Sequence, residues 1–315
     1  MNFFQTAYRG KNDAWMYVIM FFIILFGSFI GQIPITVKAY FAANGDLEKF
    51  VQSGEYAFSN LGINSNLYLF LVLVSFVVPL ILFLLAIKFM HQKRLTWVVT
   101  SRKKIDWRRF FFGVFVWATV TIIVAGFEIL LFPEKFIWNF KPMSFIILCI
   151  VAFLFIPLQT SLEELVFRGY YMQGLALWFK NKWMPLLIMS LVFGLLHYAN
   201  PEVDKIGSSI LILYIGSGFF FGLVTLMDEG TELAMGMHAI NNIIAALFIT
   251  TDWTVLQTDA LFIDISEPSI GPEMFIPLFV LYPFIFLIYS RKYGWKNWRE
   301  KIFGSVEAPS VIENE

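Results

Sequence analysis

The chain has 315 residues, of which 58% are hydrophobic and only 15% charged, and its formal net charge is zero. Soluble domains are usually nearer half apolar and a quarter charged. A soluble core of this size cannot hide so much apolar surface, 37 phenylalanines included, so the composition predicts a protein that has the lipid bilayer as its solvent. The zero net charge gives no support to nucleic acid as a partner.

Apolar runs that approach the length of a membrane-crossing helix, about 20 residues, recur along the whole sequence. We expect an all-α fold, a polytopic transmembrane helical bundle of about eight spans. The first run is expected to stay in the mature protein because no small-residue cleavage site follows it. The expected spans are 15–36, 67–90, 110–132, 143–160, 184–199, 209–227, 231–250 and 274–290.

Basic residues gather in three segments: before the first run, between the second and third runs from Lys93 to Arg109, and after the last run. The positive-inside rule assigns such segments to the cytoplasm, which places both termini there. His91, at the start of the second basic segment, is expected to be solvated. The predicted organisation is a cytoplasmic N-terminal segment (1–14), a single transmembrane domain (15–303) and a disordered polar tail (304–315).

Ionisable side chains are costly at membrane depth, so they are the first candidates for a functional site. Glu164 and Arg168 are four residues apart, which puts them on one face of a helix as an ion pair. Glu163 lies about 100° away around the same helix and is expected to remain free. Taken alone, this cluster also fits an interfacial helix that carries an ordinary surface pair.

Two further polar clusters lie in apolar runs. His197 follows Phe193 by four residues, and His238 precedes Asn242 by four. Each cluster alone also fits a structural role, because polar side chains hold helices together in membranes. If the glutamate-bearing helix continues to about Phe179, turns, and returns as the fifth span, Glu163 and His197 reach the same depth, and His238 is expected to join them.

A carboxylate, two imidazoles and an amide suggest hydrolysis. A water held between Glu163 and His197 could attack a carbonyl carbon, with His238 and Asn242 donating hydrogen bonds to the developing oxyanion. The alternative is a zinc ion bound by Glu163, His197 and His238, because two histidines and a carboxylate are a usual ligand set for catalytic zinc. The residues do not decide between these two mechanisms.

Glu163-Glu164-x-x-x-Arg168, Phe193-x-x-x-His197 and His238-x-x-x-Asn242 together resemble the three motifs of the CPBP family, which contains type II CAAX prenyl proteases and bacterial abortive-infection and bacteriocin-processing proteins. The resemblance implies an intramembrane endopeptidase, of a family that is often labelled metalloprotease, with its protease core at about 143–250. It implies Glu163 as the catalytic glutamate, Glu164 and Arg168 as its support, and His197, His238 and Asn242 as the other catalytic positions.

The same resemblance implies a peptide or a lipidated protein as substrate and a bacterial cytoplasmic membrane as location. Two other functions remain open at this point. The polar residues could hold together a non-proteolytic scaffold or bacteriocin-immunity protein, or they could form the proton path of a proton-coupled transporter. The sequence shows no clear inverted repeat, which many transporters have.

Overall fold

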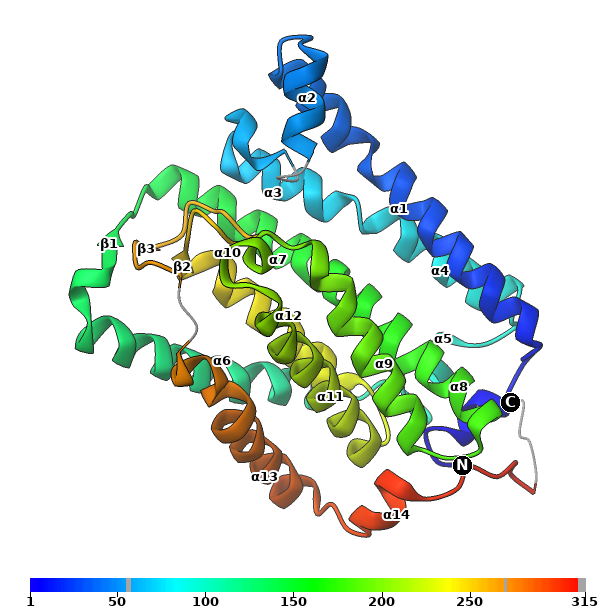
Figure 1. The fold of residues 1–315 in the computed structure, drawn as a ribbon. Helices are drawn as coiled ribbons and strands as arrows, with labels where there is room; N and C mark the ends of the chain where they lie inside the picture. The colour runs from blue at the N-terminus through cyan, green and yellow to red at the C-terminus, as the bar shows by residue number, and fades with distance from the viewer. Residues whose placement is uncertain (55–57, 269–270, 311–315) are drawn as a thin grey trace.

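The computed structural model describes residues 1–54, 58–268 and 271–310, and its architecture is a bundle of long helices (Figure 1). The predicted all-α fold class is confirmed. The helices are α1 (Ala14–Ala42), α2 (Leu47–Gly54), α3 (Ser65–Val74), α4 (Val77–Phe89), α5 (Leu95–Val99), α6 (Trp107–Leu131), α7 (Pro142–Glu164), α8 (Met172–Phe179), α9 (Trp183–Leu195), α10 (Pro201–Ile206), α11 (Leu211–Asp228), α12 (Glu232–Leu247), α13 (Tyr282–Tyr293) and α14 (Trp298–Phe303).

Five helices of the described residues are long and apolar enough to cross a membrane: Ala14–Ala42, Ser65–Phe89, Trp107–Leu131, Pro142–Phe179 and Ser208–Asp228. The chain is therefore an integral membrane protein. The other three expected spans correspond to shorter helices, α9, α12 and α13, so the number of eight crossings stays a prediction. α12 carries polar side chains and packs between α6 and α7 inside the bundle, where it needs no long lipid-facing surface.

α7 and α8 form one continuous rod, as the hairpin hypothesis requires. A π-helical segment, Leu165–Tyr171, joins them without a break, and the rod runs for 38 residues before the turn at Lys180. α9 then returns along α8. The fourth expected span, 143–160, is thus too short. The apolar run in the sequence ends at charged residues, whereas the helix continues through them to Phe179.

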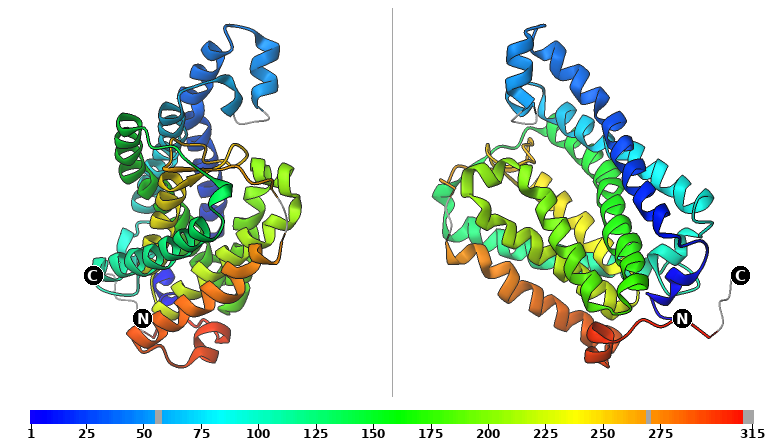
Figure 2. Two further views of the ribbon diagram at one scale, coloured as in Figure 1. Left: turned by 90° about the vertical axis from the view of Figure 1, so that its left-hand side faces the viewer. Right: turned by 45° about the vertical axis from the view of Figure 1, so that its right-hand side comes forward.

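The two ends of the bundle differ in content. A three-stranded sheet lies at one end, with β3 (Phe262–Asp264) pairing antiparallel with β1 (Phe136–Trp138) and parallel with β2 (Ile249–Thr250). The N-terminus, α5 and α14 lie at the opposite end (Figures 1 and 2). The three basic segments therefore share one end, as predicted; that this end faces the cytoplasm stays a prediction.

Two expectations about this basic end are wrong. His91 is fully buried rather than solvated, with Nδ1 2.8 Å from the carbonyl oxygen of Lys11 and Nε2 2.6 Å from the Tyr170 hydroxyl. The polar tail also begins later than expected, because Val306 is only 1% exposed and Ser305 pairs with Asn181. In both places a segment near one end of the chain packs against the bundle: the segment at Lys11 covers His91, and the segment at Ser305 packs beside Asn181. Residues 311–315 of the predicted tail lie outside the described part.

Candidate active site

The ion pair predicted on the glutamate-bearing rod is present and buried. Arg168 donates through Nη1 to Glu164 Oε1 at 2.8 Å, and the two side chains are 3% and 0% exposed. Arg168 also donates to the carbonyl oxygen of Gly218 at 3.3 Å, and its guanidinium lies 4.2 Å from the ring centroid of Phe193. Glu164 is therefore a charge-compensated carboxylate, and Arg168 connects the rod to α9 and α11.

Glu163 faces another direction, as its position on the helix predicts. Its side chain is 18% exposed and lines a cavity, while Oε1 accepts a hydrogen bond of 2.5 Å from the side-chain amide of Gln159, one turn earlier on α7. Two adjacent carboxylates thus receive different surroundings. Glu164 is enclosed with a cation, and Glu163 is held at the edge of open space.

His238 lies between these two carboxylates. Its Nδ1 is 2.7 Å from Glu164 Oε1, and its Nε2 is 3.6 Å from Glu163 Oε2. The same Glu164 oxygen accepts from the Arg168 guanidinium, and a carboxylate paired in this way is an acceptor, so Nδ1 of His238 is the donor in that contact. Nε2 then faces Glu163 Oε2 at 3.6 Å, too far for a direct hydrogen bond but close enough for the two groups to act on the same bound molecule. The structure brings His238 to the predicted glutamate and also gives it a second partner.

His197 sits in a short 3-10 turn, Leu196–Ala199, directly after α9. Its Nδ1 is 2.7 Å from the carbonyl oxygen of Phe193, which fixes the proton on Nδ1 and leaves a lone pair on Nε2. The imidazole stacks on the Tyr214 ring, with centroids 4.3 Å apart and planes 20° apart. His197 and Glu163 line the same cavity, so the common depth that the hairpin predicted is confirmed.

Asn242 reaches Glu163 through an intermediary. One of its amide protons is donated to Gln159 Oε1 at 3.3 Å, and Gln159 in turn donates to Glu163. The role of Asn242 as an oxyanion donor stays a prediction, and it would use the second amide proton. Gln159 was not identified from the sequence, although its position four residues before Glu163 was an available signal.

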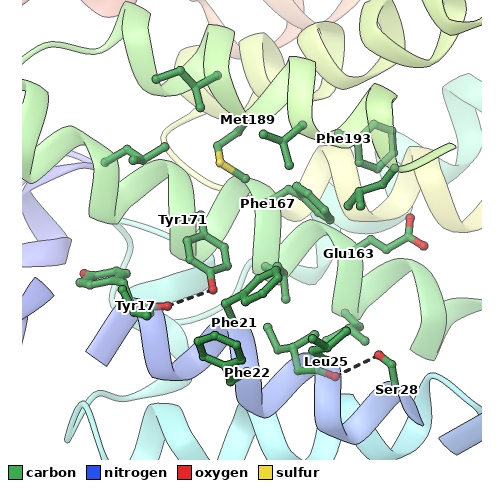
Figure 3. A pocket seen from close by; sticks show the side chains of 18 of the residues that line it. Tyr17, Phe21, Phe22, Leu25, Ser28, Glu163, Phe167, Tyr171, Met189 and Phe193 are labelled. Carbon is green, nitrogen blue, oxygen red and sulfur yellow. Dashed lines mark hydrogen bonds between the residues drawn. The ribbon is translucent and has the colours of Figure 1, made fainter. Parts of the chain in front are cut away.

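A large apolar cavity begins at these polar groups. It has a volume of about 870 Å³ and lies between α1, the α7–α8 rod and α9 (Figure 3). Glu163 lies at one end of the view, and Tyr17 and Tyr171 lie at the other, where the Tyr171 hydroxyl donates to the Tyr17 carbonyl oxygen at 3.1 Å. Phenylalanine, leucine and other apolar side chains form the wall in between, so the cavity suits a long apolar group.

Within the described residues, no group of three histidine, cysteine, aspartate or glutamate side chains is arranged to hold a metal ion. Glu163, His197 and His238, the set expected for zinc, surround one region, but His238 is engaged by Glu164 through Nδ1. Glu164 Oε2 is buried and receives no hydrogen bond from the described residues, so it is an acceptor available to a further group. The zinc hypothesis stays a prediction that metal analysis has to decide.

Comparisons with known proteins agree with this arrangement. The family model described as type II CAAX prenyl endopeptidase Rce1-like matches residues 142–244, the part that carries both glutamates, both site histidines and Asn242. The chain is also 30% identical over 257 residues to the uncharacterized protein YyaK of Bacillus subtilis (strain 168), covering 79% of this chain and 83% of that protein. No solved structure matches the chain.

Proposed function

Because the chain belongs to the Rce1-like family of type II CAAX prenyl endopeptidases, an intramembrane protease family, we propose that it hydrolyses a peptide bond within the membrane by means of a water activated by Glu163. The observation that carries this proposal is the position of Glu163. It is a carboxylate held by Gln159 and facing His238, at the polar end of a cavity of about 870 Å³.

The proposed reaction begins with proton transfer from the water to Glu163. The hydroxide equivalent attacks the carbonyl carbon, and the negative charge develops on the carbonyl oxygen. His197 Nε2 has a lone pair directed by its Nδ1 contact and can hold the water by accepting its other proton in a hydrogen bond. The low dielectric of the site strengthens each of these contacts.

His238 completes the proton path. Glu163 can pass the proton that it took from the water to His238 Nε2; the ring is then an imidazolium stabilised by Glu164, and it can protonate the departing amine nitrogen. Breaking the carbon–nitrogen bond then uses the proton that Glu163 first received. Arg168 supplies the counter-charge to Glu164 during these steps, so Glu164 and Arg168 act by holding His238 rather than by touching substrate.

The proposed substrate is a membrane-associated peptide that carries a long apolar group, such as a prenylated cysteine or an apolar helix. The cavity that leads to Glu163 is lined mostly by α1, α8 and α9 side chains of apolar character, and it can shield such a group from water. The peptide bond to be cleaved would lie at the Glu163 end.

The test uses the full-length chain in nonionic detergent with prenylated and unprenylated peptides, and mass spectrometry to identify products. Glu163→Gln should lower the cleavage rate by about 10² to 10⁴, the usual contribution of a general base. Glu128→Gln, an exposed glutamate on α6, is the matched control and should cleave like wild type. Wild-type cleavage that persists in Glu163→Gln would overturn the proposal.

Metal content is measured on the same sample. With Glu163 acting directly on water, cleavage should be unchanged by chelator. One zinc per chain together with chelator-sensitive cleavage would replace that mechanism with the zinc alternative. The scaffold alternative predicts a different result. Wild type would cleave no peptide of either kind, and Glu163→Gln would keep any protective or scaffolding phenotype that the wild-type protein confers on cells.

A further inference from the structure

Four consecutive hydrogen bonds link Glu163 to a tryptophan on another helix. Trp117 Nε1 donates to Asn241 Oδ1 at 3.1 Å, and the Asn241 amide donates to Asn242 Oδ1 at 3.1 Å. Asn242 then donates to Gln159 Oε1 at 3.3 Å, and Gln159 donates to Glu163 Oε1 at 2.5 Å. We call this series the relay. It runs from α6 through α12 to α7.

Every bond of the relay points in the same direction, toward Glu163, and both ends fix that direction. An indole nitrogen can only donate, and an ionised carboxylate can only accept. The three amides between them can each be turned by 180°, but turning any of them would set two donors or two acceptors against each other. The chemistry of the two terminal groups therefore determines the orientation of all three amides.

The surroundings make this arrangement costly to break. Trp117 is 5% exposed and packs against Phe220, Phe221 and Tyr282, with ring centroids 5.7 to 6.1 Å away. Hydrogen bonds inside a low-dielectric interior polarise one another, so a chain of bonds is stronger than its members taken singly. The three amides are half-buried at membrane depth, where an amide that lost its neighbour would have few other partners.

We propose that Trp117 and Asn241 are positioning residues for Glu163, acting through Asn242 and Gln159; this inference rests on the proposed function. The relay holds Oε1 of the carboxylate and thereby turns Oε2 toward His238 and the cavity. Removing the indole donor frees Asn241 to turn, and the inversion can pass along the amides until Gln159 presents an oxygen to Glu163. The carboxylate is then repelled from its position.

The test compares Trp117→Phe with Tyr282→Phe, which alters the same aromatic cluster outside the relay. Trp117→Phe should lower kcat about three- to tenfold, as expected for one net hydrogen bond, with KM unchanged because the cavity wall is untouched. Asn241→Leu should lower kcat at least as far. Tyr282→Phe should keep the wild-type kcat. If Trp117→Phe keeps the wild-type kcat while Glu163→Gln still loses cleavage, the inference is overturned and the proposed function stands.

A second measurement does not depend on activity. The indole N–H signal of Trp117 is assigned in the NMR spectrum by its loss in Trp117→Phe. It is then followed in Gln159→Leu and in a control, Ser161→Ala, which removes a polar side chain from the same helix outside the relay. A connected relay predicts an upfield shift of that signal in Gln159→Leu only, since the bond weakens when the series is cut. An unchanged signal would show that the bonds are independent and would overturn the relay, even if no substrate were cleaved.

Discussion

His238 Nδ1 lies 2.7 Å from Glu164 Oε1, the same oxygen that receives Arg168 at 2.8 Å. One buried oxygen thus serves a cation from its own helix and an imidazole from α12. The arrangement separates the roles of the two adjacent glutamates, since one organises the interior and the other faces the cavity.

This separation predicts opposite outcomes for two similar substitutions. Glu164→Gln leaves the guanidinium of Arg168 buried without its counter-charge and should destabilise the fold by about 3–5 kcal/mol. Glu163→Gln removes no cation partner and should leave the melting temperature near that of wild type. Thermal unfolding of both variants in nonionic detergent measures the difference, and equal melting temperatures would contradict this assignment.

The glycines between α6 and α12 predict a steric effect. A Cβ at Gly236 would lie 2.1 Å from the backbone oxygen of Phe110, and one at Gly113 would lie 2.6 Å from that of Leu233. Gly236→Ala should therefore push the helices apart and cost about 1–3 kcal/mol. The control is Gly126→Ala on α6, where a Cβ meets nothing within 4 Å and helix propensity favours alanine. Loss of stability in both variants alike would refute the close-packing argument.

Two buried bases at the basic end of the bundle predict a pH dependence of stability. Burial lowers the pKa of Lys93 from 10.5 to about 7 and the pKa of His91 from 6.5 to about 4. For each group the unfolded chain binds the proton more readily, so the stability falls as the pH is lowered from the unfolded to the folded value. The slope is up to about 1.4 kcal/mol per pH unit for each group.

Melting temperatures measured from pH 4 to pH 10 test this prediction. Lys93→Met should flatten the curve between about pH 7 and 10, and His91→Gln should flatten it between about pH 4 and 6.5, the windows set by the two shifts. A wild-type melting temperature that rises on acidification within either window would show that the sign is wrong.

Filling the cavity should affect binding more than chemistry. Val192 is 39% exposed, lies on α9 and lines the cavity, so Val192→Trp can fill space without crowding the core. We expect KM for a peptide with a long apolar group to rise about tenfold, roughly the loss of 1.4 kcal/mol of binding, with little change in kcat. Val37→Trp, at an equally lipid-facing position of α1 outside the cavity lining, should behave like wild type. A fall in kcat alone would place the obstruction at the reacting groups instead.

Local spacing predicted the parts of the site that depend on one helix. The Glu164–Arg168 pair, the separate direction of Glu163 and the hairpin that brings Glu163 and His197 to one depth all follow from the geometry of a helix and its return. Burial of His91 could not be predicted in this way, because it requires the N-terminal segment at Lys11 to fold back over it.

The cavity and the surroundings of His238 also depend on contacts distant in sequence. The wall formed by α1 lies more than a hundred residues from Glu163, and no pattern within α1 distinguishes a cavity lining from a lipid-facing surface. His238 was placed near Glu163 by helix length, but its shorter contact with Glu164 depends on the rotation of α12. Side-chain register between separate helices is decided by packing and not by hydrophobic period.

The π-helical segment Leu165–Tyr171 determines where the rod tolerates a change of length. A π-helical turn holds about one more residue than an α-helical turn, so deleting one residue from this segment would return it towards α-helix and leave α8 with nearly the same face towards the cavity. Trp178 would stay in the cavity wall, and the Glu163 end would stay as it is. A one-residue deletion in α8 before Trp178 would instead turn that side chain by about 100°, and a comparison of cleavage in the two deletion variants would distinguish the two cases.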